Sequence, residues 1–129
     1  MHKGIATLSV RGLLLDKLPA IAAAGFDGVE IFDNDLVACP ASPAEVARRC
    51  ADLGLTVDLF QPVRDASGVA ADRFPETLRR VAAKLDVAAE LGAPVVLACS
   101  HVGADSVDDL DLLAEQLRAV PLPRPGPPG

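Results

Sequence analysis

The strongest constraint on the fold is a pattern that occurs three times along the chain. Each copy joins an Ala- and Leu-rich stretch, a glycine and a short run rich in β-branched residues. The copies span residues 22–31, 50–59 and 88–97. A glycine at this place is typical of the position after a helix, where the backbone takes a positive φ. The pattern therefore predicts helices that stop at Gly25, Gly54 and Gly92, each followed within three residues by a strand.

An opening apolar run over residues 5–10 completes an alternation of four strands and four helices. The predicted strands are 5–10, 29–32, 56–60 and 95–99. The predicted helices are 14–24, 43–53, 74–91 and one from about 106–108 to 120. Pro19 interrupts the first helix, and because proline is tolerated best in a first turn, a start at Pro19 is also open. Strands separated by helices run parallel, so the fold class is α/β, and we expect both faces of the sheet to be covered.

Length and composition limit the class of protein. The 129 residues are half hydrophobic, which suits one domain over residues 1–120. Residues 121–129 hold five of the 11 prolines and predict an extended, disordered tail. A net charge of −6 argues against nucleic-acid binding, and apolar runs of only about ten residues are too short for a membrane span. Three widely spaced cysteines and no signal peptide favour a reducing cytoplasm.

Candidate functional residues are the polar ones at or just beyond the carboxyl ends of the strands, where parallel α/β folds place their sites. They are Arg11, Glu30, Asp33, Asp35, Gln61, Arg64, Asp65, Ser100 and His101. Glu30 lies inside a strand, so it faces either a site or a structural ion pair. The planar guanidinium of Arg64 suits a carboxylate or phosphate, with a salt bridge to neighbouring acidic residues as the equal alternative.

The remaining candidates have stronger structural explanations. Asp33 and Asp35 favour capping of a turn or of the next helix. A single histidine such as His101 has too little context to define an acid, base or ligand, and Cys99 fits simple packing. The chain has no glycine-rich phosphate loop and no paired-histidine metal motif. The residues alone therefore identify no reaction and assign no catalytic or metal-binding residue.

Two segments carry a resemblance to a known family. Residues 21–36, followed by Cys50-Ala-Asp-Leu-Gly-Leu and Leu59-Phe-Gln-Pro-Val-Arg-Asp65, resemble the sugar phosphate isomerase/epimerase superfamily of xylose isomerase-like TIM barrels. Within it, the sequence is most similar to bacterial 3-dehydroshikimate dehydratases. The similarity continues through residues 84–100 and covers about residues 3 to 119. The Phe-Gln-Pro-x-Arg-Asp segment is its most specific part.

The resemblance implies a (β/α)₈ barrel of which this chain holds only the N-terminal half, about four βα units. It implies a lyase that converts 3-dehydroshikimate to protocatechuate with a divalent metal, Mg²⁺ or Mn²⁺, held by the second half of the barrel. The substrate positions that carry over are Glu30, Gln61, Arg64 and Ser100, together with His101, where we expect asparagine in the family. Two alternatives remain: a sugar phosphate or keto acid isomerase/epimerase, and a non-catalytic truncated fragment.

A half barrel leaves its edge strands unpaired and its concave face open. We therefore expect this chain alone to be inactive, to bind no metal tightly and to be prone to self-association through the open edges. The expected partner in the family is a small hydroxy or keto acid.

Overall fold

The parallel sheet is the centre of the structure, and its strands follow one another in chain order. The computed structural model describes residues 1–121, and the predicted tail over 121–129 lies outside these residues apart from Pro121. The strands β1 (Gly4–Ala6), β2 (Gly28–Phe32), β3 (Thr56–Val63) and β4 (Val96–Ala98) form one sheet with the order β1-β2-β3-β4. All three neighbouring pairs are parallel. This order confirms the barrel-type arrangement and excludes a flavodoxin-like one.

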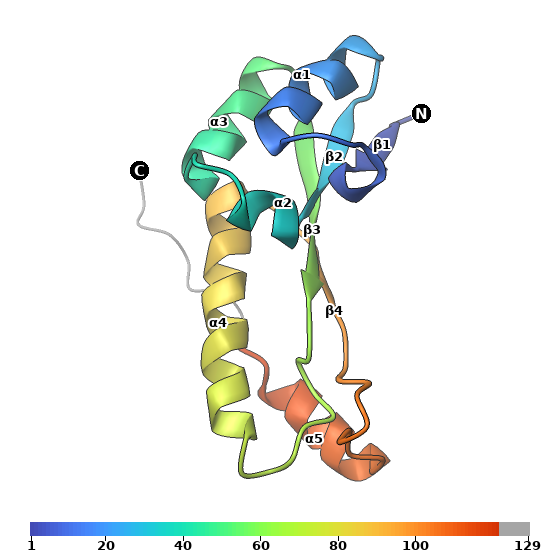
Figure 1. The fold of residues 1–129 in the computed structure, drawn as a ribbon, viewed down its shortest axis with the longest axis vertical. Coiled ribbons are helices and arrows are strands. Elements are labelled where there is room, and N and C mark those ends of the chain that lie inside the picture. Colours follow the sequence, from blue (N-terminus) through green and yellow to red (C-terminus); the bar gives the residue numbers. More distant parts are fainter. Residues whose placement is uncertain (122–129) are drawn as a thin grey trace.

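The helices α1 (Leu14–Ala23), α3 (Pro43–Asp52) and α4 (Phe74–Leu91) lie along one side of the sheet, as Figure 1 shows. Their apolar residues pack on Val29, Ile31 and Phe60, which are fully buried. The three repeat glycines have positive φ, and Gly92 ends α4 in the left-handed conformation that only glycine adopts without strain. The repeat therefore predicted three helix stops correctly.

The expectation that both faces of the sheet are covered is wrong for residues 1–121. The opposite face carries no helix of this part of the chain, and the side chains of Val95 and Leu97 there are 50% and 47% exposed. The physical reason is that a strand curved into a barrel wall has its outer face against helices and its inner face toward the barrel interior. Four strands leave that interior open.

The first strand is shorter than predicted. It ends at Ala6, and Thr7–Ser9 form a 3₁₀ turn, η1, in place of a continued strand. Thr7 is buried: its hydroxyl accepts a hydrogen bond from the Phe32 amide at 3.0 Å, and its carbonyl accepts one from Nζ of Lys17 at 2.9 Å. These two long-range bonds stabilise a turn that local sequence does not reveal.

Other boundaries also differ from the predictions. α1 begins at Leu14 and contains Pro19 in its interior, so the alternative start at Pro19 is wrong. β3 extends to Val63, and β4 is limited to three residues. The last helix, α5 (Leu110–Ala119), begins later than expected because the carboxylate of Asp109 caps it. A short helix that was not predicted, α2 (Asp33–Val37), follows β2. No helix in the described part of the chain is long and apolar enough to cross a membrane.

Candidate functional site

Glu30 and Gln61 share the open face of the sheet. Side chains alternate along a strand, and their neighbours Val29, Ile31 and Phe60 point into the helix-covered core. Pairing places Glu30 opposite Leu59 and Phe32 opposite Gln61, so these four residues line the same inner surface. No ion pair holds Glu30 among residues 1–121, which leaves its carboxylate directed to the open side.

Arg64 follows directly at the carboxyl end of β3 and is exposed. Its Nη1 donates a hydrogen bond to Oδ1 of Asn34 at 3.1 Å, and its guanidinium lies 5.8 Å from the centre of the Phe32 ring. Within the described residues it forms no salt bridge, so the ion-pair alternative for Arg64 finds no support there. The guanidinium is thus oriented by an amide and a ring and keeps donors available for a ligand.

The carboxylates of Asp33 and Asp35 each form a salt bridge with a lysine. Oδ1 of Asp33 lies 2.9 Å from Nζ of Lys84, and Oδ2 of Asp35 lies 2.8 Å from Nζ of Lys17, whose side chain is only 5% exposed. Both aspartates are in the first turn of α2, where the positive end of the helix dipole stabilises a carboxylate. The prediction that they cap a turn or the next helix is therefore wrong: no side chain caps α2, and both carboxylates pair with lysines that are distant in the sequence.

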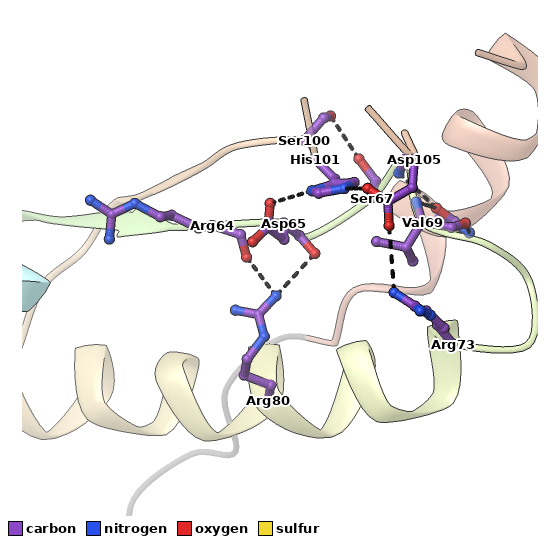
Figure 2. A network of polar contacts seen from close by, with 11 residues as sticks. Arg64, Asp65, Ser67, Val69, Arg73, Arg80, Ser100, His101 and Asp105 are labelled. Atoms are coloured by element: carbon purple, nitrogen blue, oxygen red, sulfur yellow. Dashed lines mark hydrogen bonds and ion pairs between the residues drawn. The ribbon is translucent and has the colours of Figure 1, made fainter. Parts of the chain in front are cut away.

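Ser100 and His101 belong to a second group, beyond the end of β4. The hydroxyls of Ser100 and Ser67 lie 2.8 Å apart. Figure 2 shows the ring of His101 between two carboxylates, with Nδ1 3.0 Å from Asp65 and Nε2 2.6 Å from Asp105. The hydrogen bond to Asp105, and after it the one to Asp65, raises the pKa of His101. The hydrogen bond with His101 in turn lowers the pKa of Asp105.

His101 of this second group borders an open cavity of about 520 Å³ between α4 and the two loops that follow β3 and β4. Glu76 and Arg80 line it from α4, Arg73 from the turn just before this helix, and His101 from the loop after β4. Arg80 is held by the backbone carbonyls of Arg64 and Asp65, at 2.6 and 3.0 Å. The five predicted substrate residues therefore form two groups: Glu30, Gln61 and Arg64 at the open face, and Ser100 and His101 in the loops.

Sequence analysis did not identify Gln116, which connects α5 to the loop after β3. Its side chain is 2% exposed; Oε1 accepts from the Gly68 amide at 2.8 Å, and Nε2 donates to the Val69 carbonyl at 2.7 Å. The side-chain amide thus pairs with the loop as a neighbouring peptide unit does. Its position three residues after Leu113, on the apolar stripe of α5, is the only signal in the sequence.

The described residues do not fit a divalent metal. Within residues 1–121, no group of three His, Cys, Asp or Glu side chains is placed to hold an ion. The carboxylates near the rim already have partners: lysines for Asp33 and Asp35, and the imidazole of His101 for Asp65 and Asp105. Glu30 alone cannot provide the several oxygens that Mg²⁺ or Mn²⁺ requires.

Comparisons with known proteins match this architecture. The family model of the xylose isomerase-like TIM barrel matches residues 18–122. The chain belongs to this family. A protein named 3-dehydroshikimate dehydratase from Pseudomonas putida is 52% identical over 92% of the chain. A solved xylose isomerase-like TIM barrel/4-hydroxyphenylpyruvate dioxygenase fusion protein is 51% identical, covers 93% of the chain and superposes with a TM-score of 0.88.

The match is partial on the side of the relatives. The chain spans 19% of the length of the Pseudomonas protein and 19% of the fusion protein. A solved sugar phosphate isomerase/epimerase from Parabacteroides distasonis is 22% identical and superposes with a TM-score of 0.66. The match covers 89% of this chain and 44% of that protein. This last likeness shows the shared fold. The four strands of the chain therefore correspond to about half of the barrel.

Proposed function

We propose that the chain provides the substrate-binding wall of a lyase that dehydrates 3-dehydroshikimate to protocatechuate. The name of the Pseudomonas relative at 52% identity supports this reaction over an isomerase, because the isomerase-like structure at 22% identity supports only the fold. The substrate class is a small hydroxy and keto acid. We further infer a cytoplasmic protein without a nucleic-acid partner, which the charge of −6 supports.

The observation that carries the proposal is the guanidinium of Arg64 beside the open face. It is exposed, oriented by Asn34 and Phe32, and unpaired with any acidic group in the described chain. A guanidinium binds a carboxylate through two parallel hydrogen bonds. Glu30 and Gln61, on the same face, are placed to accept and donate hydrogen bonds with the hydroxyl groups of such an acid.

Ser100 and His101 stay in the proposal as substrate contacts made from the loop beyond β4. Because His101 already bonds two carboxylates, its proposed contribution is to orient that loop through Asp65, the residue after Arg64. No residue of this chain is assigned as the base that removes a proton. The metal that the family resemblance implies finds no ligand set in residues 1–121, so the chain alone is proposed to bind substrate without turnover.

The experiment is a titration of the isotope-labelled chain with 3-dehydroshikimate, followed by amide NMR. We expect shifts at Phe32, Gln61 and Arg64, their loss in Arg64→Ala, and their persistence in the control Arg49→Ala, whose guanidinium lies on α3. Absent shifts, or shifts unaffected by Arg64→Ala, would remove the proposed site. Formation of protocatechuate by the purified chain with Mg²⁺ or Mn²⁺ would contradict the proposed lack of turnover.

The partner of the chain is also part of the proposal. The inner face and both edges of the sheet are open in residues 1–121, which supports self-association through these edges.

A further inference from the structure

The free edge of β4 presents two unused peptide groups. The Val95 carbonyl accepts from the Phe60 amide at 3.0 Å, and the Cys99 amide donates to the Val63 carbonyl at 2.9 Å. Because peptide groups alternate in direction along a strand, odd-numbered residues here bond β3 and the amides of Val96 and Ala98 point away from it. No other strand among residues 1–121 takes up these groups.

The free edge of β1 is its counterpart. The Lys3 carbonyl accepts from the Gly28 amide at 3.3 Å, so odd-numbered residues bond β2. The peptide groups of Gly4 and Ala6 then point to the outside. Each three-residue edge strand therefore has two residues whose backbone N–H and C=O groups point outward, and the two edges match in length and direction.

The inner face between these edges is apolar at β4 and polar at the centre. Val95 and Leu97 are half exposed there. Glu30 and Asp58, whose carboxylate covers Gly28 on the same face, are acidic; the ring of His2 bonds Asp58, and Arg64 at the rim is basic, so each copy brings groups of both signs to the interior.

We propose that two copies of the chain associate about a twofold axis along the barrel, with β4 of each copy pairing in parallel with β1 of the other. Four strands from each copy close an eight-stranded parallel barrel, the architecture of the family to which the chain belongs. The inference rests on the proposed function in one respect, the use of the Arg64 rim as the substrate site. The second copy completes this site, because its own Glu30, Gln61 and Arg64 line the same interior.

The direction of the axis decides the consequence for the site. Rotation about the barrel axis keeps all strands parallel and brings both Arg64 rims to one mouth. Rotation about a perpendicular axis would pair β4 with β4 in antiparallel fashion and place the two rims at opposite ends. The parallel arrangement also buries Val95 and Leu97 inside a closed barrel, which leaves no strand edge exposed.

Sedimentation equilibrium of the purified chain tests the association without substrate. We expect a species of twice 13.3 kDa. Ala98→Pro removes an outward amide while leaving the bonds to β3, and Leu97→Lys places a charge in the interior; both are expected to give monomers with unchanged helical circular dichroism. The control Val37→Lys, at an exposed position of α2, should stay dimeric. A monomeric wild-type chain, a larger assembly, or dimers that survive both variants overturn the proposal.

Cysteine cross-linking tests the pairing itself. In a Cys99→Ser background, oxidation is expected to give covalent dimers for the double variant Ala6→Cys/Leu97→Cys, whose side chains both face the interior, and none for either single variant. Dimers linked through Leu97→Cys alone would indicate β4 against β4 and overturn the parallel barrel. Because neither experiment uses 3-dehydroshikimate, a dimer that fails to bind this acid would reject the proposed function alone, and a monomer that binds it would reject the dimer alone.

Discussion

Nε2 of His101 lies 2.6 Å from Oδ1 of Asp105, while Nδ1 of the same ring lies 3.0 Å from Oδ1 of Asp65. A neutral imidazole has only one N–H, whereas the imidazolium has two, so both carboxylates accept hydrogen bonds only when His101 is protonated. Asp65 belongs to the loop after β3 and Asp105 to the loop after β4. Protonated His101 therefore connects the two loops that border the Arg64 rim.

The first prediction is that this connection weakens with rising pH. The pKa of His101 is raised above its ordinary value of 6.5 by Asp105 and then Asp65, so the stabilisation is fully present below pH 6.5 and is lost as the pH rises through the folded-state pKa. At the acid end it requires ionised carboxylates, and it is lost as the pH falls through the lowered pKa of Asp105. The other charged groups beside this histidine are Arg73, whose Nη1 lies 3.5 Å from Oδ2 of Asp105, and Arg80, which donates to the backbone carbonyl of Asp65.

Amide hydrogen exchange of residues 64–69 and 99–107 measures this loss. In the wild-type chain, protection should fall between neutral and alkaline pH by more than the intrinsic exchange rate accounts for. His101→Gln, which keeps one donor, should show lower protection and no such step. Equal pH dependence in both proteins would exclude the histidine as its origin.

The second prediction concerns Gly28, whose Cα is covered by side chains of β3. A Cβ there would overlap Oδ2 of Asp58 and lie 2.6 Å from Oγ1 of Thr56, itself hydrogen-bonded to Asp58. Overpacking of this kind typically costs about 1–3 kcal/mol. Gly28→Ala should lower the free energy of unfolding by that amount in urea, and by less in an Asp58→Ala background, where the main obstacle is absent. Equal costs in both backgrounds would show that Asp58 moves aside freely.

The architecture was predictable because local signals repeat. Gly25, Gly54 and Gly92 mark helix ends through backbone conformation, which is a property of a few neighbouring residues. The parallel order of strands follows from the helices between them. The family resemblance added the barrel curvature, which local patterns do not contain.

The features that were not predicted depend on contacts distant in sequence. The turn at Thr7 requires the amide of Phe32, 25 residues away, and Asp33 is neutralised by Lys84, 51 residues away. For the same reason the candidate residues could be named but not grouped. Only the fold separates Glu30, Gln61 and Arg64 from Ser100 and His101.

The third prediction concerns the attachment of α5. Gln116→Leu removes the acceptor of the Gly68 amide and the donor to the Val69 carbonyl, both in buried surroundings. A buried polar group without a partner costs about 1–3 kcal/mol. We expect a loss of unfolding free energy of that size and faster proteolysis of the loops over residues 64–73 and 99–109. Glu115→Leu, at the exposed neighbouring position, is the matched control and should change stability by less than about 0.5 kcal/mol.

The last prediction addresses Arg64 in a complete barrel. Residues 1–120 replace the matching segment of the Pseudomonas putida dehydratase, and the chimera is assayed for protocatechuate with and without Arg64→Ala. If the guanidinium pairs with the substrate carboxylate in a partly desolvated site, its loss costs about 2–4 kcal/mol of binding, seen mainly as a raised KM. Arg64→Lys should recover only part of this, because an ammonium cannot donate in the bidentate manner. Arg49→Ala should leave the kinetics unchanged, since its side chain pairs with Glu45 on the outer helix α3. Kinetics of the Arg64→Ala chimera equal to those of its parent would exclude Arg64 from the site.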